Sequence, residues 1–361
     1  MPPISYANLP EAEKLWLLAL DFGGTKHSAA LVAWRPGQAQ ASLLAQGWQA
    51  FERVYSPPEA NAQYDLDTIL ALSHRLAEGK QLAAVGVSFG GPVEAATGTV
   101  RLSHHVPGWE NISLAVYLQT ALGIPARVDN DANVAALGEH LFGAGRGCDS
   151  LMYITISTGV GGGWILNGRP WHGAQSMAGE IGHTVVDPNG PLCLCGKRGC
   201  VERLASGPYM AADAREQLQE SIQKLGANPL HALPPEEGGV LLDLVQGDLQ
   251  NLTAVHISQA ALQGDGLARR ILMRGASALG TGIGNAANLI NPQRFILGGG
   301  VTKSGELFWQ SVRQAARQTA LPEIEFEIIP AALGDDAPLW GAVALAQSCL
   351  QPERLSLDSR E

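Results

Sequence analysis

The sequence predicts an α/β fold divided into two lobes. Its 361 residues are enough for two domains that each bury a core of their own. Apolar runs of strand length alternate with helix-length segments along the chain. A hairpin pattern also occurs twice, once near the start of each half. Together these three observations favour two α/β lobes built on a related plan.

The repeated hairpin is the clearest of these signals. Residues 15–34 (LWLLALDFGGTKHSAALVAW) and 151–166 (LMYITISTGVGGGWIL) each contain an apolar run, a glycine-rich turn and a second apolar run. This is the pattern of a β-hairpin. Aligning Gly24 with Gly159 gives an offset of 135 residues, about the length of one domain. We therefore expect a duplicated hairpin that opens each half.

The remaining elements follow from apolar periodicity. Strands are expected at 83–93, 126–130, 294–301 and 324–330, and helices at 66–78, 112–122, 131–142, 207–224, 253–290 (as two helices) and 338–350. The first lobe is placed at 1–130, completed by the helix at 338–350, and the second at 131–337, with a polar tail at 351–361. Residues 226–250 mix proline, glycine and charge, which indicates a surface loop with a short helix.

The composition, with 46% hydrophobic and 16% charged residues, is that of a soluble globular protein. A net charge of -10 argues against nucleic acid or an anionic membrane as the partner. No apolar run approaches the ~20 residues of a membrane-spanning helix. The N-terminus lacks the basic region and cleavage site of a secretory signal. We expect a cytoplasmic protein, in which five cysteines do not form a disulfide framework.

The two glycine-rich turns are candidates for phosphate binding. The turn DFGGTK, Asp21 to Lys26, combines a carboxylate, two glycines, a hydroxyl and an ammonium group. Phosphate groups prefer backbone N–H donors and a cation, and Mg²⁺ prefers a carboxylate or the water that it orders. The second turn, Ser157 to Gly163, offers donors without a carboxylate, as expected if it holds the other side of a polyphosphate. The alternative is two plain turns. A P-loop is excluded, because its glycine and lysine spacing does not occur.

A group of polar residues lies where the strand at 126–130 is expected to give way to a helix. Asp129, Asn130 and Asp131 are consecutive there. One interpretation is ordinary capping of the helix N-terminus. The other is a site, in which Asn130 supplies a donor and an acceptor to a hydroxyl-rich ligand and Asp131 accepts the proton of an attacking alcohol. We take Asp131 as the candidate base and Asp129 as structural.

A histidine and three cysteines form a candidate metal site. His183, Cys193, Cys195 and Cys200 follow the spacing H-x9-C-x-C-x4-C, interrupted only by turn-forming residues. One imidazole and three thiolates suit tetrahedral Zn²⁺ with no open position, which indicates a structural role. The alternatives are four unconnected residues or a transient Cys195/Cys200 redox pair.

A zinc-binding loop at 183–200 would also hold two nearby carboxylates. Glu180 and Glu202 flank the loop, and carboxylates are good acceptors for neighbouring sugar hydroxyls. Taken alone, each of these residues is more often a solvated surface charge. Cys148 and Cys349 are expected to be core thiols.

Six motifs, taken in order, resemble one family. They are DFGGTK at 21–26, VDNDANVAALGE at 128–139, TISTGVGGG at 155–163, GEIGH at 179–183, CLCGKRGCVE at 193–202 and LGGGV at 297–301. Together they resemble the ROK family of bacterial sugar kinases and repressors, over roughly residues 15–349. The resemblance implies a two-lobed actin-like, hexokinase-type (ribonuclease H-like) fold with nucleotide and sugar in a central cleft.

The resemblance also implies roles for individual residues. The implied substrate-binding set is Gly90, Gly91, Asn130, Asp131, Glu180, His183 and Glu202, with Asp131 as the catalytic base. The implied nucleotide-binding set is Asp21, Gly23, Gly24, Thr25, Lys26, Thr158, Gly159, Gly298, Gly299 and Gly300. Two features depart from the family pattern, SFGGPV at 88–93 and His105, and they bear on the identity of the sugar.

The resulting hypothesis is a glucokinase-like enzyme that uses ATP, Mg²⁺ and a structural Zn²⁺. It would move the γ-phosphoryl group of ATP to a hexose hydroxyl, with O6 of glucose as the first choice. The alternatives are an N-acylhexosamine kinase, acting on N-acetylglucosamine or N-acetylmannosamine, and a sugar-sensing transcriptional repressor of the same family. Polyphosphate remains open as the donor. The family habit suggests a homodimer.

Overall fold

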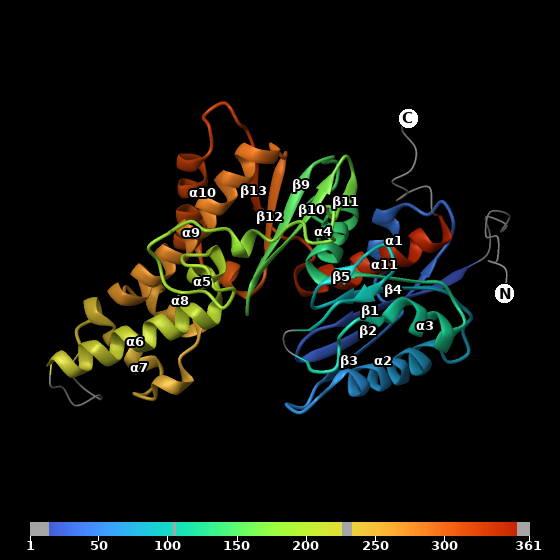
Figure 1. Ribbon diagram of the computed structural model, residues 1–361, viewed down its shortest axis with the longest axis horizontal. Coiled ribbons are helices and arrows are strands. Elements are labelled where there is room, and N and C mark those ends of the chain that lie inside the picture. The colour runs from blue at the N-terminus through green and yellow to red at the C-terminus, as the bar shows by residue number, and fades with distance from the viewer. Residues whose placement is uncertain (1–13, 104–105, 226–232, 352–361) are drawn as a thin grey trace. The chain divides into compact units, whose positions relative to one another are not determined.

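Successive apolar side chains along strand β1 (Leu15–Phe22) point to opposite faces of the first sheet. Leu18 and Leu20 are buried in one apolar cluster, and Leu17 and Ala19 are buried in another cluster on the opposite face. A sheet that is apolar on both faces needs helices on both sides. The computed structural model, which describes residues 14–103, 106–225 and 233–351, shows this arrangement (Figure 1).

The remaining strands and helices have the following bounds. The strands are β2 (Lys26–Trp34), β3 (Ala50–Tyr55), β4 (Leu82–Phe89), β5 (Val93–Glu94), β6 (Thr99–Val100), β7 (Ile112–Ser113), β8 (Ala126–Asn130), β9 (Leu151–Ile156), β10 (Val160–Leu166), β11 (Arg169–Trp171), β12 (Arg294–Gly298) and β13 (Glu327–Pro330). The α-helices are α1 (Gln40–Gln46), α2 (Ala62–Ala77), α3 (Leu114–Leu122), α4 (Asp131–Phe142), α5 (Val201–Ala205), α6 (Gly207–Leu225), α7 (Gly239–Leu244), α8 (Ala254–Leu262), α9 (Gly266–Ile290), α10 (Glu306–Thr319) and α11 (Ala337–Leu350).

The first sheet has the strand order β3-β2-β1-β4-β8. Strands β1, β2 and β3 pair antiparallel, whereas β1, β4 and β8 are parallel. Helices α2 and α3 cover one face, and α4 and α11 cover the other. Figure 1 shows α2 and α3 on one side of this sheet and α11 on the opposite side. A three-layer α/β arrangement therefore surrounds the first hairpin.

The second hairpin lies in a sheet of the same plan, with the strand order β11-β10-β9-β12-β13. Position by position, β9 corresponds to β1, β10 to β2, β12 to β4 and β13 to β8. Strands β12 and β13 are parallel, as β4 and β8 are. The expected duplication of the hairpin is therefore confirmed, and it extends to whole sheets.

The described residues divide into two compact units. One contains the chain up to Tyr153, residues 163–178 and the chain from Ala331 onward, and the other contains residues 154–162 and 179–330. The expected boundary at residue 130 falls inside the first unit, where α4 packs against α11. Helix α11 belongs to the same unit as the sheet that it covers.

The segment 331–333 is held to α4 by a fully buried carboxylate. Glu139 accepts hydrogen bonds from the backbone N–H groups of Ala144 (2.7 Å), Ala332 (3.1 Å) and Leu333 (2.8 Å). Three donors compensate the loss of water around this group. The contacts fix the path of the chain as it enters α11.

Most expected elements are confirmed within a few residues. The segment 253–290 forms two helices, α8 and α9, and the strand expected at 294–301 ends at Gly298. Part of 226–250 lies outside the described residues; the rest contains the short helix α7. Among the helices that the structure describes, none combines the length and apolar character that a bilayer span requires.

Candidate functional site

The first glycine bend closes the hairpin between β1 and β2. The Gly23 N–H donates to the carbonyl of Lys26 over 3.0 Å, while Gly24 and Thr25 are exposed. Asp21 lies one residue before the end of β1, and its carboxylate accepts a 2.7 Å hydrogen bond from the Ser88 hydroxyl on β4. The bend therefore presents exposed backbone and hydroxyl groups beside a fixed carboxylate.

Burial raises the pKa of Asp21 above its ordinary value. The hydrogen bond from Ser88 and the charge of Lys26 act in the opposite direction but do not cancel this effect. The nearby donors and positive charges of the protein therefore do not fully compensate the burial of the Asp21 carboxylate. A cation bound at this bend would supply the missing compensation, so Asp21 fits the role expected of it near Mg²⁺.

The strand-to-helix turn at 129–131 lies next to this bend. Asn130 ends β8 and caps α4, and Asp131 is the first residue of the helix. A methyl group added at Gly90 would lie 3.2 Å from the Phe22 carbonyl oxygen and 3.9 Å from the Asp131 Oδ2 atom. The candidate base, the first glycine bend and the Gly90 backbone are therefore gathered within the first unit.

Both ends of the Asn130 amide are already engaged. The Oδ1 atom accepts from the backbone N–H groups of Ala132 (3.0 Å) and Asn133 (3.4 Å), and the Nδ2 atom donates to the Gly91 carbonyl (3.0 Å). Asn130 therefore joins the start of α4 to the Gly91 loop. Its expected role toward a ligand hydroxyl stays a prediction.

The second glycine bend lies in the other unit, between β9 and β10. The Ser157 N–H donates to the Gly159 carbonyl over 2.9 Å, and the Glu202 Oε2 atom accepts from the Val160 N–H over 2.9 Å. Thr158 is exposed. The carboxylate of Glu202 is thus fixed to the bend, at one of its two oxygens.

A third glycine turn packs directly against the strand that leads into this bend. Gly298 ends β12, and Gly299 adopts a φ of 89°. A Cβ atom at Gly299 would lie 2.3 Å from the carbonyl oxygen of Ile156, so only glycine fits there. Gly300 has open space around it. The expected nucleotide-side residues of the second unit are therefore neighbours.

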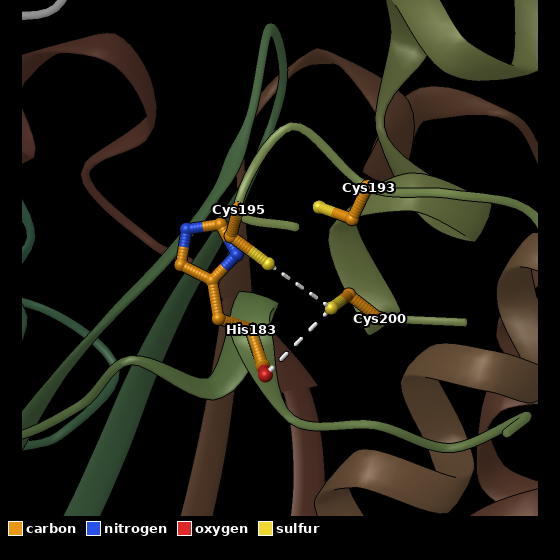
Figure 2. Close-up of side chains that lie close together, drawn as sticks. All are labelled: His183, Cys193, Cys195 and Cys200. Carbon is orange, nitrogen blue, oxygen red and sulfur yellow. Dashed lines mark hydrogen bonds between the residues drawn. The ribbon is translucent and has the colours of Figure 1, made fainter. Parts of the chain in front are cut away.

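The four candidate metal ligands come together in the second unit. The ligand atoms of His183, Cys193, Cys195 and Cys200 all lie within 4.8 Å of one another. Figure 2 shows the imidazole ring and the three sulfur atoms pointing toward a common centre. The Cys195 and Cys200 sulfurs are 3.5 Å apart, close to the spacing of two thiolates on one tetrahedral ion with Zn–S bonds of about 2.3 Å.

Two observations indicate that this cluster fits a cation. The His183 Nδ1 atom is buried and has no hydrogen-bond partner among the described residues, so it is available as a ligand. Burial and the neighbouring cysteines raise the pKa of Cys200 to about 12. The Cys200 thiol therefore resists ionisation when no metal is bound, and a bound dication reverses that effect.

The cluster also places the two candidate carboxylates. Glu180 is exposed and directly precedes a short 3₁₀ turn, Ile181–His183, that ends in a candidate metal ligand. Glu202 lies in the first turn of α5, which begins immediately after Cys200. Both carboxylates are therefore within three residues of a ligand. His105 lies outside the described residues.

Sequence reasoning missed two histidine–aspartate pairs in the first unit, of which His27–Asp65 is fully buried and His172–Asp129 is partly buried. The His172 Nε2 atom lies 2.6 Å from the Asp129 Oδ2 atom, and the His27 Nε2 atom lies 2.7 Å from the Asp65 Oδ1 atom. Trp109 donates to the second oxygen of Asp65 over 2.9 Å. The partners are separated by 43 and 38 residues, and no local motif links them.

Comparison with a solved structure identifies the class of fold. A ROK family glucokinase from Streptomyces griseus, in complex with glucose and AMPPNP, superposes with a TM-score of 0.74 at 33% identity, covering 93% of this chain and 100% of that one. The expected fold is thereby confirmed. The protein has the two-lobed, actin-like fold of these sugar kinases.

Sequence comparison then identifies the family. The ROK family model matches residues 17–349, so the chain belongs to the ROK family. A glucokinase of Thermotoga maritima is 32% identical over 92% of this chain and 97% of its own length. A xylose repressor of Caldicellulosiruptor bescii is 28% identical over 74% of this chain and 63% of its own length. The family thus includes both kinases and regulators.

The raised pKa of Asp21 predicts that Asp21→Asn stabilises the free protein at about pH 7. Because the pKa of Asp21 is higher in the folded than in the unfolded chain, folding favours the protonated form. The contribution of Asp21 to stability is therefore lost as the pH rises through the folded-state pKa. An asparagine carries no charge and keeps an acceptor for Ser88. Urea unfolding should show a higher free energy of unfolding for the variant.

The same experiment at low pH is the internal control, because Asp21 is then protonated in both states and the gain should vanish. Asp67→Asn, on the exposed side of α2, should change stability little at either pH. An Asp21→Asn variant no more stable than the wild type at about pH 7 would contradict the raised pKa of Asp21.

Proposed function

We propose that this ROK-family sugar kinase transfers the γ-phosphoryl group of ATP to a hexose hydroxyl, with O6 of glucose as the acceptor. The observation that carries the proposal is the gathering of Asp131 and the DFGGTK bend around the Gly90 backbone. One group accepts a proton and the other holds phosphate, and phosphoryl transfer to an alcohol needs both. The glucose and AMPPNP bound to the Streptomyces griseus relative support this choice of substrates.

In the proposed reaction the Asp131 carboxylate takes the proton of the sugar hydroxyl. The sugar oxygen forms the new bond to the γ-phosphorus, the bond to the bridging oxygen breaks, and ADP leaves with the electron pair. Magnesium, when bound, neutralises charge on the phosphates. The Lys26 ammonium and the backbone N–H groups of the bends orient the phosphates. A positioned base such as Asp131 contributes about 10² to 10⁴-fold to the rate.

On the sugar side we propose a set of polar groups that hold the hydroxyls. They are the side chains of Asn130, Glu180, His183 and Glu202 and the backbone of Gly90 and Gly91. Glu202 suits this role because its Oε2 atom is fixed by the Val160 N–H, which leaves the orientation of its Oε1 atom defined. For the nucleotide we propose a second set, which consists of Asp21, Gly23, Gly24, Thr25, Lys26, Thr158, Gly159, Gly298, Gly299 and Gly300.

We also propose that His183, Cys193, Cys195 and Cys200 hold one structural Zn²⁺. The buried His183 Nδ1 atom and the close sulfurs support this proposal. The ion would supply rigidity, because Glu180 and Glu202 lie within three residues of its ligands. No step of the phosphoryl transfer passes through it.

A sugar panel tests the acceptor. We expect ADP release with glucose to exceed release with N-acetylglucosamine or N-acetylmannosamine, measured with ATP and with polyphosphate as donors. Higher turnover of an N-acylhexosamine would replace glucose with that class. Absence of turnover with every sugar, together with a gel shift on promoter DNA, would replace the kinase with the repressor alternative.

Replacing the base tests the mechanism. Asp131→Asn and Asp131→Ala should lower kcat by about 10² to 10⁴-fold or more, because proton acceptance is lost. Folding and ATP affinity should stay close to those of the wild type, measured by circular dichroism and calorimetry. Asp67→Asn, in the same unit, is the control and should keep its turnover. Wild-type turnover in Asp131→Asn would remove this residue from the chemistry.

Metal content tests the zinc site. Purified protein should contain about one Zn²⁺ per chain, and Cys195→Ser should lose both the metal and sugar affinity. Cys349→Ser, which changes a thiol on α11, should keep both. Elemental analysis and calorimetry report these quantities without an activity assay. Full metal content in Cys195→Ser would exclude the proposed ligand set.

A further inference from the structure

The buried carboxylate of Asp129 lies two residues before Asp131 in the strand-to-helix turn. Asp129 is 4% exposed and is the next-to-last residue of β8. Its Oδ1 atom accepts from the Asn130 N–H (2.7 Å) and from the Asn133 side-chain amide (3.2 Å). Its Oδ2 atom lies 2.6 Å from the His172 Nε2 atom. Since a carboxylate only accepts hydrogen bonds, the imidazole is the donor.

These contacts hold the chain on both sides of Asp131. The Asn130 N–H precedes Asp131, and the Asn133 side chain projects from the first turn of α4 that follows it. One carboxylate therefore fixes the end of the strand and the start of the helix. The orientation of the Asp131 side chain depends on the end of the strand and on the start of the helix.

The partner histidine comes from a separate element of the same unit. His172 directly follows β11, its side chain is 22% exposed, and its carbonyl accepts from the Ala178 N–H over 2.9 Å. The closed loop 172–178 then leads to Glu180. His172 thus contacts the 129–131 turn from a chain segment that continues to Glu180 in the sequence.

The charge balance of the pair favours a protonated histidine. Burial alone would lower the pKa of His172, but the hydrogen bond and negative charge of Asp129 outweigh it, so that the pKa is raised. Asp129 is the charged side chain that produces this effect. A buried carboxylate with two neutral donors and one cationic donor is well compensated, whereas the loss of the cation leaves a charge buried without its partner.

We propose that His172 is a positioning residue, which orients Asp131 for proton transfer by holding Asp129 in place. The inference rests on the proposed role of Asp131 as the base. Without His172, the buried Asp129 carboxylate lacks one hydrogen-bond donor. We expect it to shift toward water or another donor and to displace the 129–133 turn. Displacements of about 1 Å at a reacting group cost as much as ~10²-fold in rate.

Two variants at this position separate positioning from stability. His172→Ala removes the donor and should lower kcat by about 10- to 100-fold, with KM for ATP little changed. His172→Gln keeps an N–H donor within reach of Asp129 and should recover most of kcat. His74→Gln, on the exposed side of α2, is the control and should match the wild type.

The outcomes are distinguishable. A lower free energy of unfolding in His172→Ala with unchanged kcat for the folded enzyme would show a purely structural histidine and overturn the inference alone. Equal losses of kcat in the Ala and Gln variants would overturn it as well, because the retained donor would have no effect. A wild type that phosphorylates no sugar would overturn the proposed function and, with it, this inference.

A measurement without turnover tests the pair itself. The imidazole of His172, followed by NMR during a pH titration, should have a pKa above the ordinary value in the wild type. In Asp129→Asn the pKa should fall, because the charge that raises it is gone. An unchanged pKa in that variant would show that the two side chains do not interact in solution, and would overturn the inference.

Discussion

The capping of α4 by Asn130 is the interaction on which the first-unit site depends. A helix N-terminus leaves backbone N–H groups without partners, and Asn130 satisfies two of them while its amide nitrogen holds the Gly91 carbonyl. The strand end, the helix start and the loop after β4 are thereby fixed to one another. This local geometry positions Asp131. The backbone of Gly90 lies close both to the Asp131 carboxylate and to the DFGGTK bend.

The duplicated sheet explains why the candidate residues occur in two related sets. The bends at 23–25 and 157–159 follow equivalent strands, β1 and β9. The glycines at 90–91 and 299–300 likewise follow equivalent strands, β4 and β12. Ligand-binding groups in α/β proteins gather at the carboxyl ends of parallel strands, and both sets obey this rule. One plan therefore supplies two sets of backbone donors, and their side chains differ: the first set carries Asp21 and Lys26, and the second carries hydroxyls.

Contiguous motifs could be predicted from the sequence, and paired side chains from distant segments could not. The two hairpins, the helix after Asn130 and the His183 to Cys200 spacing are all visible within short stretches. The pairing of Asp129 with His172 depends on where β11 packs, which no local pattern reveals. The unit boundary depends on the packing of α4 against α11 and is equally hidden. Homodimer formation and the absence of nucleic-acid binding remain predictions.

The position of α11 also has a consequence during protein synthesis. This helix covers one apolar face of the first sheet, yet it is made about 200 residues after β8, which completes that sheet. At a ribosomal rate of about 5 to 20 residues per second, the delay is on the order of tens of seconds. During this delay, Leu17, Ala19 and Val32 of the nascent chain are not yet covered by α11. Until α11 is made, this face of the first sheet is an incompletely covered apolar surface of the kind that chaperones shield.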